Sequence, residues 1–158
     1  MITYFFLKFL HVVGTAALLG TGAGIPFFLL LAHRTGRAST IAAVARIVVI
    51  ADFVFTATTV VVQPITGILL SIQLGIPLSE GWIAVSILLY LVTGAFWIPV
   101  IFMQIRIRDL ATVAARSGRA LPAEYHRLFR HWVAFGFPAF GAVLAIVWLM
   151  IAKPTIQL

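Results

Sequence analysis

Four stretches of the chain are almost wholly apolar over the length that a bilayer requires. They cover roughly residues 2–32, 41–73, 81–105 and 131–152, and a membrane-spanning helix needs about 20 such residues. In residues 106–130, by contrast, arginines alternate with apolar residues. The pattern predicts an all-α fold in a single integral membrane domain (residues 1–158). We expect an antiparallel four-helix transmembrane bundle with a cytoplasmic helical hairpin between the third and fourth spans.

Charge placement predicts the orientation of these spans. Nine arginines lie in or beside the loop 33–40 and the hairpin 106–130, whereas the other side of the membrane has only Lys8 and Lys153. The positive-inside rule therefore places both termini outside and both basic segments in the cytoplasm. We expect a multi-pass protein of the bacterial cytoplasmic (inner) membrane.

Composition narrows the classes of function. Only 9% of residues are charged, against about 25% in soluble domains, and there is no cysteine for a disulfide or thiolate site. The net charge of +7 does not indicate nucleic-acid binding, because the arginines flank membrane spans and accompany no recognition motif. The arginines are consistent either with a hairpin that is simply solvated or with one that binds anionic lipid or a membrane partner.

Polar residues line up along the second and third spans. At 100° per residue, each set falls within about 40° of one line, and the two antiparallel lines match in depth. We expect them to face each other as a polar seam, serving either as structural hydrogen bonds between helices or as a ligand or proton cavity. The seam residues are Asp52, Thr56, Thr59, Gln63 and Thr66 in the second span and Ser86, Tyr90, Thr93, Trp97 and Gln104 in the third.

Asp52 is the only carboxylate within a span. Its expected partners at the cytoplasmic end are Arg106, Arg108 or His131, which would make it a structural ion pair; a proton-handling role is the alternative. Further along the same span, Pro64 frees a backbone carbonyl and is expected to kink the helix.

The first span places His11 above a face that also carries Gly22. Imidazole is a ligand of haem iron, and a glycine-lined strip suits a flat macrocycle; a hydrogen-bonded structural histidine is the alternative. The opposite face repeats small residues at Ala16, Gly20 and Gly24, where another helix can approach. The candidate metal ligand is His11, and the candidate cofactor-binding residues are His11, Lys8, Gly22, Gln63 and Tyr90.

Several separated motifs resemble one family over nearly the whole chain. KFLHVVG, VVVQPITG, LPAEYHRLFRHW and VLAIVWLMIAKP resemble the bacterial predicted integral membrane proteins grouped as domain of unknown function 2269. More distantly, the segment from Lys8 to Gly20 is similar to the first helix of HemJ-type protoporphyrinogen oxidases and CopD copper-resistance membrane proteins. This second resemblance implies that His11 ligates haem b.

These observations favour three hypotheses. The first is a b-type haem or porphyrin-binding redox or electron-transfer protein, with the seam handling protons or a quinone-like substrate. The second is transport of a small solute or protons through the seam, with Asp52 and Gln63 at opposite ends and homo-oligomers to complete the path. The third is a non-catalytic membrane subunit whose basic hairpin docks a partner. Whether the protein is an enzyme stays open at this stage.

Overall fold

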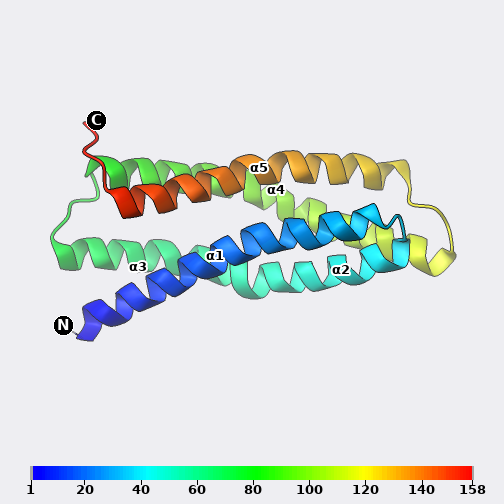
Figure 1. The fold of residues 1–158 in the computed structure, drawn as a ribbon, viewed down its shortest axis with the longest axis horizontal. Coiled ribbons are helices and arrows are strands. Elements are labelled where there is room, and N and C mark those ends of the chain that lie inside the picture. Colours follow the sequence, from blue (N-terminus) through cyan, green and yellow to red (C-terminus); the bar gives the residue numbers. More distant parts are fainter. Residues whose placement is uncertain (1, 158) are drawn as a thin grey trace.

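The computed structural model describes residues 2–157, which form four long antiparallel helical segments (Figure 1). The first is α1 (Ile2–Arg34). The second is continuous from α2 (Ala38–Ala51) through a π-helix, η1 (Asp52–Ala57), into α3 (Thr58–Leu74). The third and fourth are α4 (Gly81–Ser117) and α5 (Ala123–Ala152). All four are long and apolar enough to cross a membrane, which confirms the predicted four-helix transmembrane fold.

The helices extend beyond the predicted spans at the arginine-rich end of the bundle. The predicted span 81–105 continues as helix to Ser117, and the predicted span 131–152 begins at Ala123. Gly118 ends α4 in the left-handed conformation, with φ of 64°, which costs glycine little because it has no Cβ. The hairpin therefore consists of two helix extensions around a five-residue turn. We call this the basic end, and the opposite end the terminal end.

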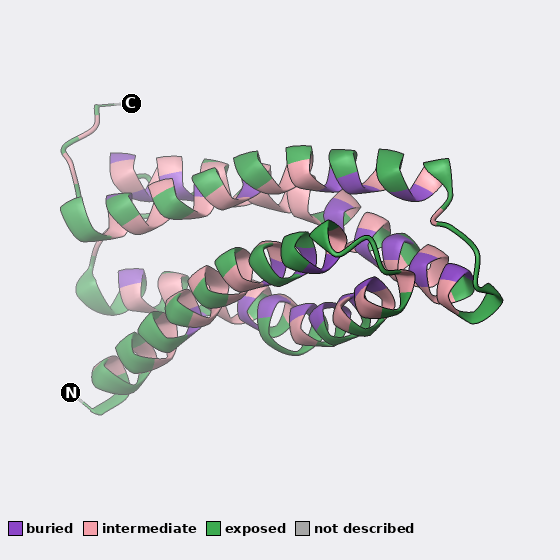
Figure 2. Cartoon of the chain, turned by 45° about the vertical axis from the view of Figure 1, so that its right-hand side comes forward, coloured by how far each residue is buried: buried purple, intermediate pink, exposed green. Residues whose placement is uncertain are grey.

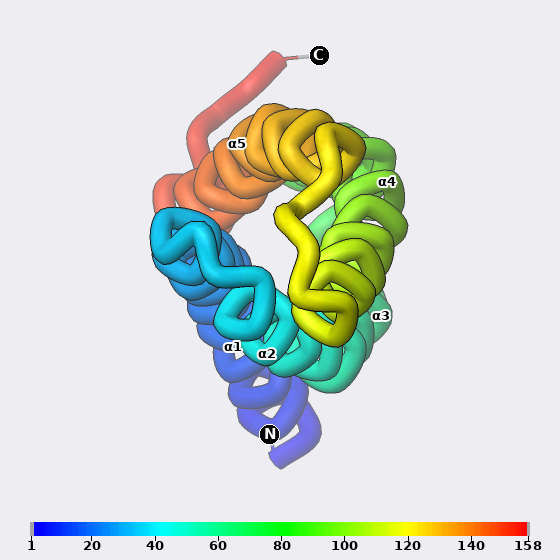
Figure 3. Tube along the Cα trace, turned by 90° about the vertical axis from the view of Figure 1, so that its right-hand side faces the viewer, coloured from blue at the N-terminus to red at the C-terminus, as the bar shows by residue number. Residues whose placement is uncertain are grey.

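The segments are arranged as two pairs. The first pair is α1 with the second segment, and the other is α4 with α5; the pairs join where α2 packs against α4. Figure 1 shows the pairs together at the basic end and further apart at the terminal end. Figure 3, viewed along the bundle, shows the four segments in a ring. The core lies toward the basic end and includes Leu29, Ile41, Ile107, Tyr125 and Phe129.

The outer surface of the bundle is apolar, as a lipid environment requires. Buried residues lie on the inward faces of the helices and exposed ones on the outside (Figure 2), and the exposed set includes many large apolar side chains. The expected helix-packing stripe on α1 lies on this outer surface: Ala16 and Gly20 are exposed, and a Cβ added at Gly20 would meet nothing within 4 Å. The expectation that this stripe packs against another helix of the same chain was wrong. The close approaches between α1 and other helices occur at Gly14 and Gly22 instead.

The π-helix is the main departure from the sequence-based picture. Its hydrogen bonds join residues five apart, so its turn holds about one residue more than an α-helical turn. One extra residue rotates everything beyond it by about 100° relative to an unbroken helix. The polar line predicted along the second span is therefore divided at η1.

Candidate ligand-binding cavity

A cavity of about 650 Å³ lies between the two helix pairs, near the middle of the bundle. Small-molecule sites usually have volumes of about 300–1,000 Å³. Its lining comes from α1, η1, α3, α4 and α5 and is mostly aliphatic and aromatic. The polar side chains in the lining are Thr21, Asp52, Thr56, Tyr90, Thr93, Trp97, Gln104 and Trp132.

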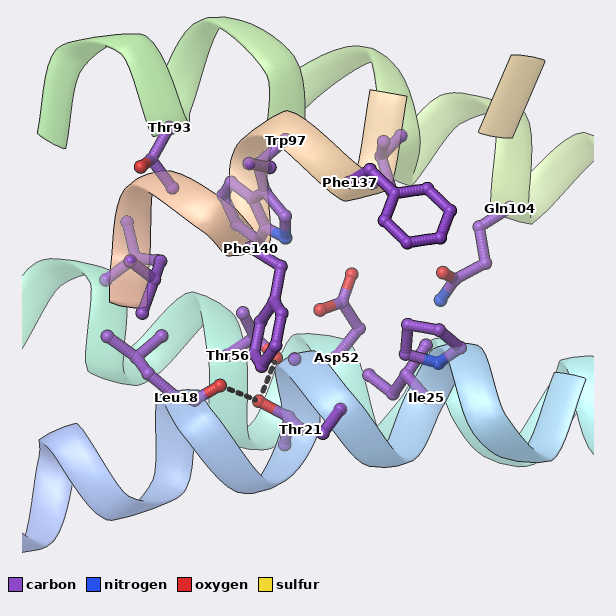
Figure 4. A pocket seen from close by; sticks show the side chains of 18 of the residues that line it. Leu18, Thr21, Ile25, Asp52, Thr56, Thr93, Trp97, Gln104, Phe137 and Phe140 are labelled. Atoms are coloured by element: carbon purple, nitrogen blue, oxygen red, sulfur yellow. Dashed lines mark hydrogen bonds between the residues drawn. The ribbon is translucent and has the colours of Figure 1, made fainter. Parts of the chain in front are cut away.

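Among the described residues that line the cavity, Asp52 is the only one with an ionisable acidic or basic side chain apart from the Tyr90 phenol. The residue is 5% exposed, and its carboxylate points into the space bounded by Trp97, Phe137 and Gln104 (Figure 4). Among the described residues it takes part in neither ion pair that the chain forms. The cavity is thus an apolar chamber that holds one unpaired carboxylate.

Two of the three expected partners of Asp52 are engaged elsewhere, and the third, His131, is exposed and forms no ion pair among the described residues. Arg106 binds Glu124 of the hairpin, with Nε 2.9 Å from Oε1, and Arg108 binds its neighbour Asp109 at 2.7 Å. The expected structural ion pair was therefore wrong for both arginines. Each arginine lies where water and an acidic neighbour are available, whereas reaching Asp52 would require burying a guanidinium.

The hydroxyl beside Asp52 is committed to another partner. Thr56 donates to the Thr21 hydroxyl at 3.0 Å, and Thr21 donates in turn to the Ala17 carbonyl at 2.9 Å. Figure 4 draws the Thr56–Thr21 bond and a longer contact of 3.4 Å from the Thr21 hydroxyl to the Leu18 carbonyl, so both threonine protons have acceptors away from Asp52. The N–H groups drawn near the carboxylate in that view belong to the Trp97 indole and the Gln104 amide. The carboxylate therefore keeps accepting capacity that faces the cavity.

Aromatic rings form the opposite side of the chamber. Phe137 and Phe140 of α5 face Asp52 across the cavity (Figure 4). Phe140 lies so close to α1 that a Cβ added at Gly22 would come within 2.8 Å of its ring. Gly22 was predicted to receive a cofactor, and in the structure it accommodates this phenylalanine.

A hydrogen bond closes the cavity on the side that faces the basic end. Trp132 donates its indole N–H to Gln104 Oε1 at 3.2 Å, and both residues are 3% exposed or less. Trp132 lies inside the bundle and not at a membrane–water interface, where tryptophans are enriched in membrane proteins. The reason is that its N–H finds a buried acceptor on α4.

The cavity also opens sideways. Strongly exposed lining residues mark the openings: Phe27 of α1 and Phe137 of α5 are 57% and 74% exposed. On α4, Leu91 and Ile98 likewise combine exposure with a place in the lining. In a bilayer, openings on the side of the bundle would face hydrocarbon.

The other half of the predicted seam lies against α1 rather than α4. His11 Nδ1 is 2.8 Å from the Thr66 hydroxyl, and Gln63 donates to the His11 carbonyl at 2.8 Å. Thr15 also donates to that carbonyl, at 2.9 Å. His11, Gln63 and Thr66 form what we call the His11 cluster, and none of them lines the cavity.

Tyr90 links the two halves of the predicted polar seam. Its hydroxyl donates to the Val60 carbonyl at 2.7 Å, the carbonyl that Pro64 leaves without a helical partner. Tyr90 and Val60 both line the cavity. The predicted cofactor-binding residue Tyr90 is thus the hydrogen-bonded bridge between α3 and α4.

The remaining predicted residues bond within their own helices or lie outside the cavity. Thr59, Ser86 and Thr93 each donate to a backbone carbonyl four residues earlier, and Thr93 also lines the cavity. Lys8 is exposed, with its ammonium 5.7 Å from the centre of the Tyr4 ring. Sequence reasoning missed Thr21, Phe137 and Phe140, because isolated threonines and phenylalanines in apolar helices carry no distinguishing pattern.

Comparison with known proteins agrees with the membrane architecture. Neither the curated proteins nor the solved structures contain a significant match to this chain. A family model described as "Predicted integral membrane protein (DUF2269)" matches residues 5–154, which is nearly the whole chain. The protein therefore belongs to the DUF2269 family of predicted integral membrane proteins.

Proposed function

We propose that the protein binds a lipophilic organic cation in the central cavity. One observation carries the proposal: the buried carboxylate of Asp52 faces an otherwise neutral chamber and has no cationic partner among the described residues. A charged aspartate at mid-membrane costs about 2.5–3.5 kcal/mol on insertion scales. A cationic ligand would offset that cost by pairing with the carboxylate.

The lining supports a bulky, apolar cation rather than a hydrated metal ion. Trp97, Phe137 and Phe140 surround the carboxylate (Figure 4), and aromatic faces attract organic cations. Metal ions prefer several oxygen or nitrogen ligands, whereas the described residues contain no cluster of three histidines, cysteines or acids. The lateral openings suit a molecule that partitions into the bilayer.

Calorimetric titration of the purified full chain in detergent tests the proposal. Tetraphenylphosphonium is the probe, and tetraphenylborate, which has the same shape and the opposite charge, is its control. We expect binding of the cation and little binding of the anion. Asp52→Asn should weaken cation binding about 10–100-fold, which is about 1.4–2.8 kcal/mol. Equal affinities for the two ions, or an unchanged affinity in Asp52→Asn, would contradict the proposal.

Two further variants test whether binding depends on the net charge of the protein or on this particular cavity. Glu80→Gln changes the net charge as Asp52→Asn does, but Glu80 occupies the N-cap position of α4 at the terminal end and does not line the cavity, so binding should be unchanged. Gly136→Leu should weaken binding with the carboxylate intact, because Gly136 lines the cavity and has open space beside it.

Haem ligation by His11 is a second candidate, supported by one hydrogen bond. The Thr66 hydroxyl is 2.8 Å from the Val62 carbonyl and donates to it, so Thr66 accepts from His11 Nδ1–H. That tautomer leaves Nε2 with a free lone pair, as iron ligation requires. Because His11 is not in the cavity lining, a haem held there would lie outside the chamber. A Soret band after haem-supplemented expression, lost in His11→Ala, is the expected result; a colourless protein would contradict this candidate.

A further inference from the structure

Every helix that faces Asp52 across the cavity presents neutral groups. The lining contributed by α1 has Thr21 as its polar side chain, and that of α5 has Trp132. On α4 the titratable group is Tyr90, whose hydroxyl is bound to the Val60 carbonyl. The lining residues of η1 and α3 other than Asp52 are Thr56 and Val60. Asp52 is therefore the one acidic site that balances charge in the chamber.

A single carboxylate balances a single positive charge. With two cations bound, the low-dielectric chamber would carry a net positive charge. With no cation or proton bound, it would hold an uncompensated carboxylate. Both states are unfavourable. We propose that a proton and the lipophilic cation exclude each other at Asp52, so that the protein exchanges one for the other. This inference rests on the proposed function.

The exchange is balanced in atoms and charge. The protonated carboxyl loses its O–H proton as the organic cation binds, and the carboxylate that remains pairs with that cation. No covalent bond to the ligand forms, and no oxidant or reductant takes part. The proton leaves the chamber with its positive charge, so the charge inside is the same before and after.

The packing closes one end of the chamber. Toward the basic end the chamber is closed by Trp132 and Gln104, with the fully buried Leu29 and Ile107 in the core beyond them. The cation therefore does not reach Asp52 through the basic end.

Proton release can be measured directly. Tetraphenylphosphonium is titrated into the full chain in detergent, at one pH, in buffers with different enthalpies of ionisation. The slope of the observed heat against buffer enthalpy gives the number of protons released, which we expect to approach one per bound cation at low pH. The affinity should fall about tenfold for each pH unit below the point at which the free carboxyl becomes protonated.

The outcomes separate this inference from the proposed function. If tetraphenylphosphonium binds with no proton release and with constant affinity from about pH 5 to pH 9, a range that spans ordinary and raised carboxyl pKa values, the exchange is refuted while binding stands. If no binding occurs in wild-type protein, the proposed function itself fails. Asp52→Glu should bind and release a proton, with a displaced pH profile. Tyr90→Phe should also release a proton, and loss of release in that variant would assign the proton to the phenol and overturn the inference.

Discussion

Replacing Tyr90 with phenylalanine tests how the two helix pairs are held together across the cavity. The Tyr90 hydroxyl donates to the Val60 carbonyl at 2.7 Å. That carbonyl has no N–H partner from residue 64, because residue 64 is proline. Removing the hydroxyl would leave the carbonyl without a donor in apolar surroundings.

The size of the effect follows from two estimates. Leaving a buried polar group unpaired costs about 1–3 kcal/mol, whereas hydrogen bonds between membrane helices average about 0.6 and reach about 1.7 kcal/mol. We therefore expect Tyr90→Phe to lower the free energy of unfolding by about 1–1.5 kcal/mol. The measurement is reversible unfolding of the purified protein in mixed detergent micelles of increasing denaturing-detergent content.

A double-mutant cycle identifies the cause. Pro64→Ala restores an N–H that can bond the Val60 carbonyl within the helix, so Tyr90→Phe should cost about 1 kcal/mol less in that background. Tyr125→Phe is the control, because its hydroxyl bonds His33 at the basic end and its effect should be equal in both backgrounds. An equal loss for Tyr90→Phe with and without Pro64 would refute the reasoning.

Two other substitutions should destabilise the fold in the same unfolding assay. Gly14→Ala should lower stability by about 1–3 kcal/mol, because the added Cβ would overlap the Gln63 amide; Gly20→Ala, with open space, should be neutral or gain up to about 1 kcal/mol. Similar effects of the two substitutions would contradict the packing. Trp132→Phe should lose about 1–3 kcal/mol, because it removes the donor to the buried Gln104; a neutral effect would show that the closed side of the cavity does not depend on this bond.

Sequence periodicity was enough to predict the spans but not the partners of buried polar groups. The four apolar stretches exceed bilayer length, and that property depends only on local composition. The partners of Asp52 were predicted from its nearness to the arginine-rich end of the spans. Its surroundings depend on how α4 and α5 pack, which a single helical period does not encode.

The glycines of α1 show the same limit. Ala16, Gly20 and Gly24 have the regular spacing of a packing stripe, yet the faces of α1 that meet other helices carry Gly14 and Gly22. A spacing rule marks where close approach is sterically allowed. The choice between two permitted faces is made by the partners, here Gln63 on α3 and Phe140 on α5.

The π-helix explains why one predicted seam became two separate sites. In an unbroken α-helix, Asp52 and Gln63 would point the same way, and a ligand could reach both. The rotation of about 100° introduced at η1 lets Asp52 face the cavity while Gln63 bonds the backbone of α1 at His11. Both placements are held by tertiary hydrogen bonds, since Thr56 within η1 bonds α1 at Thr21. The carboxylate chamber and the His11 cluster therefore share one helix but not one ligand, and substitutions at Asp52 should leave any haem spectrum that depends on His11 unchanged.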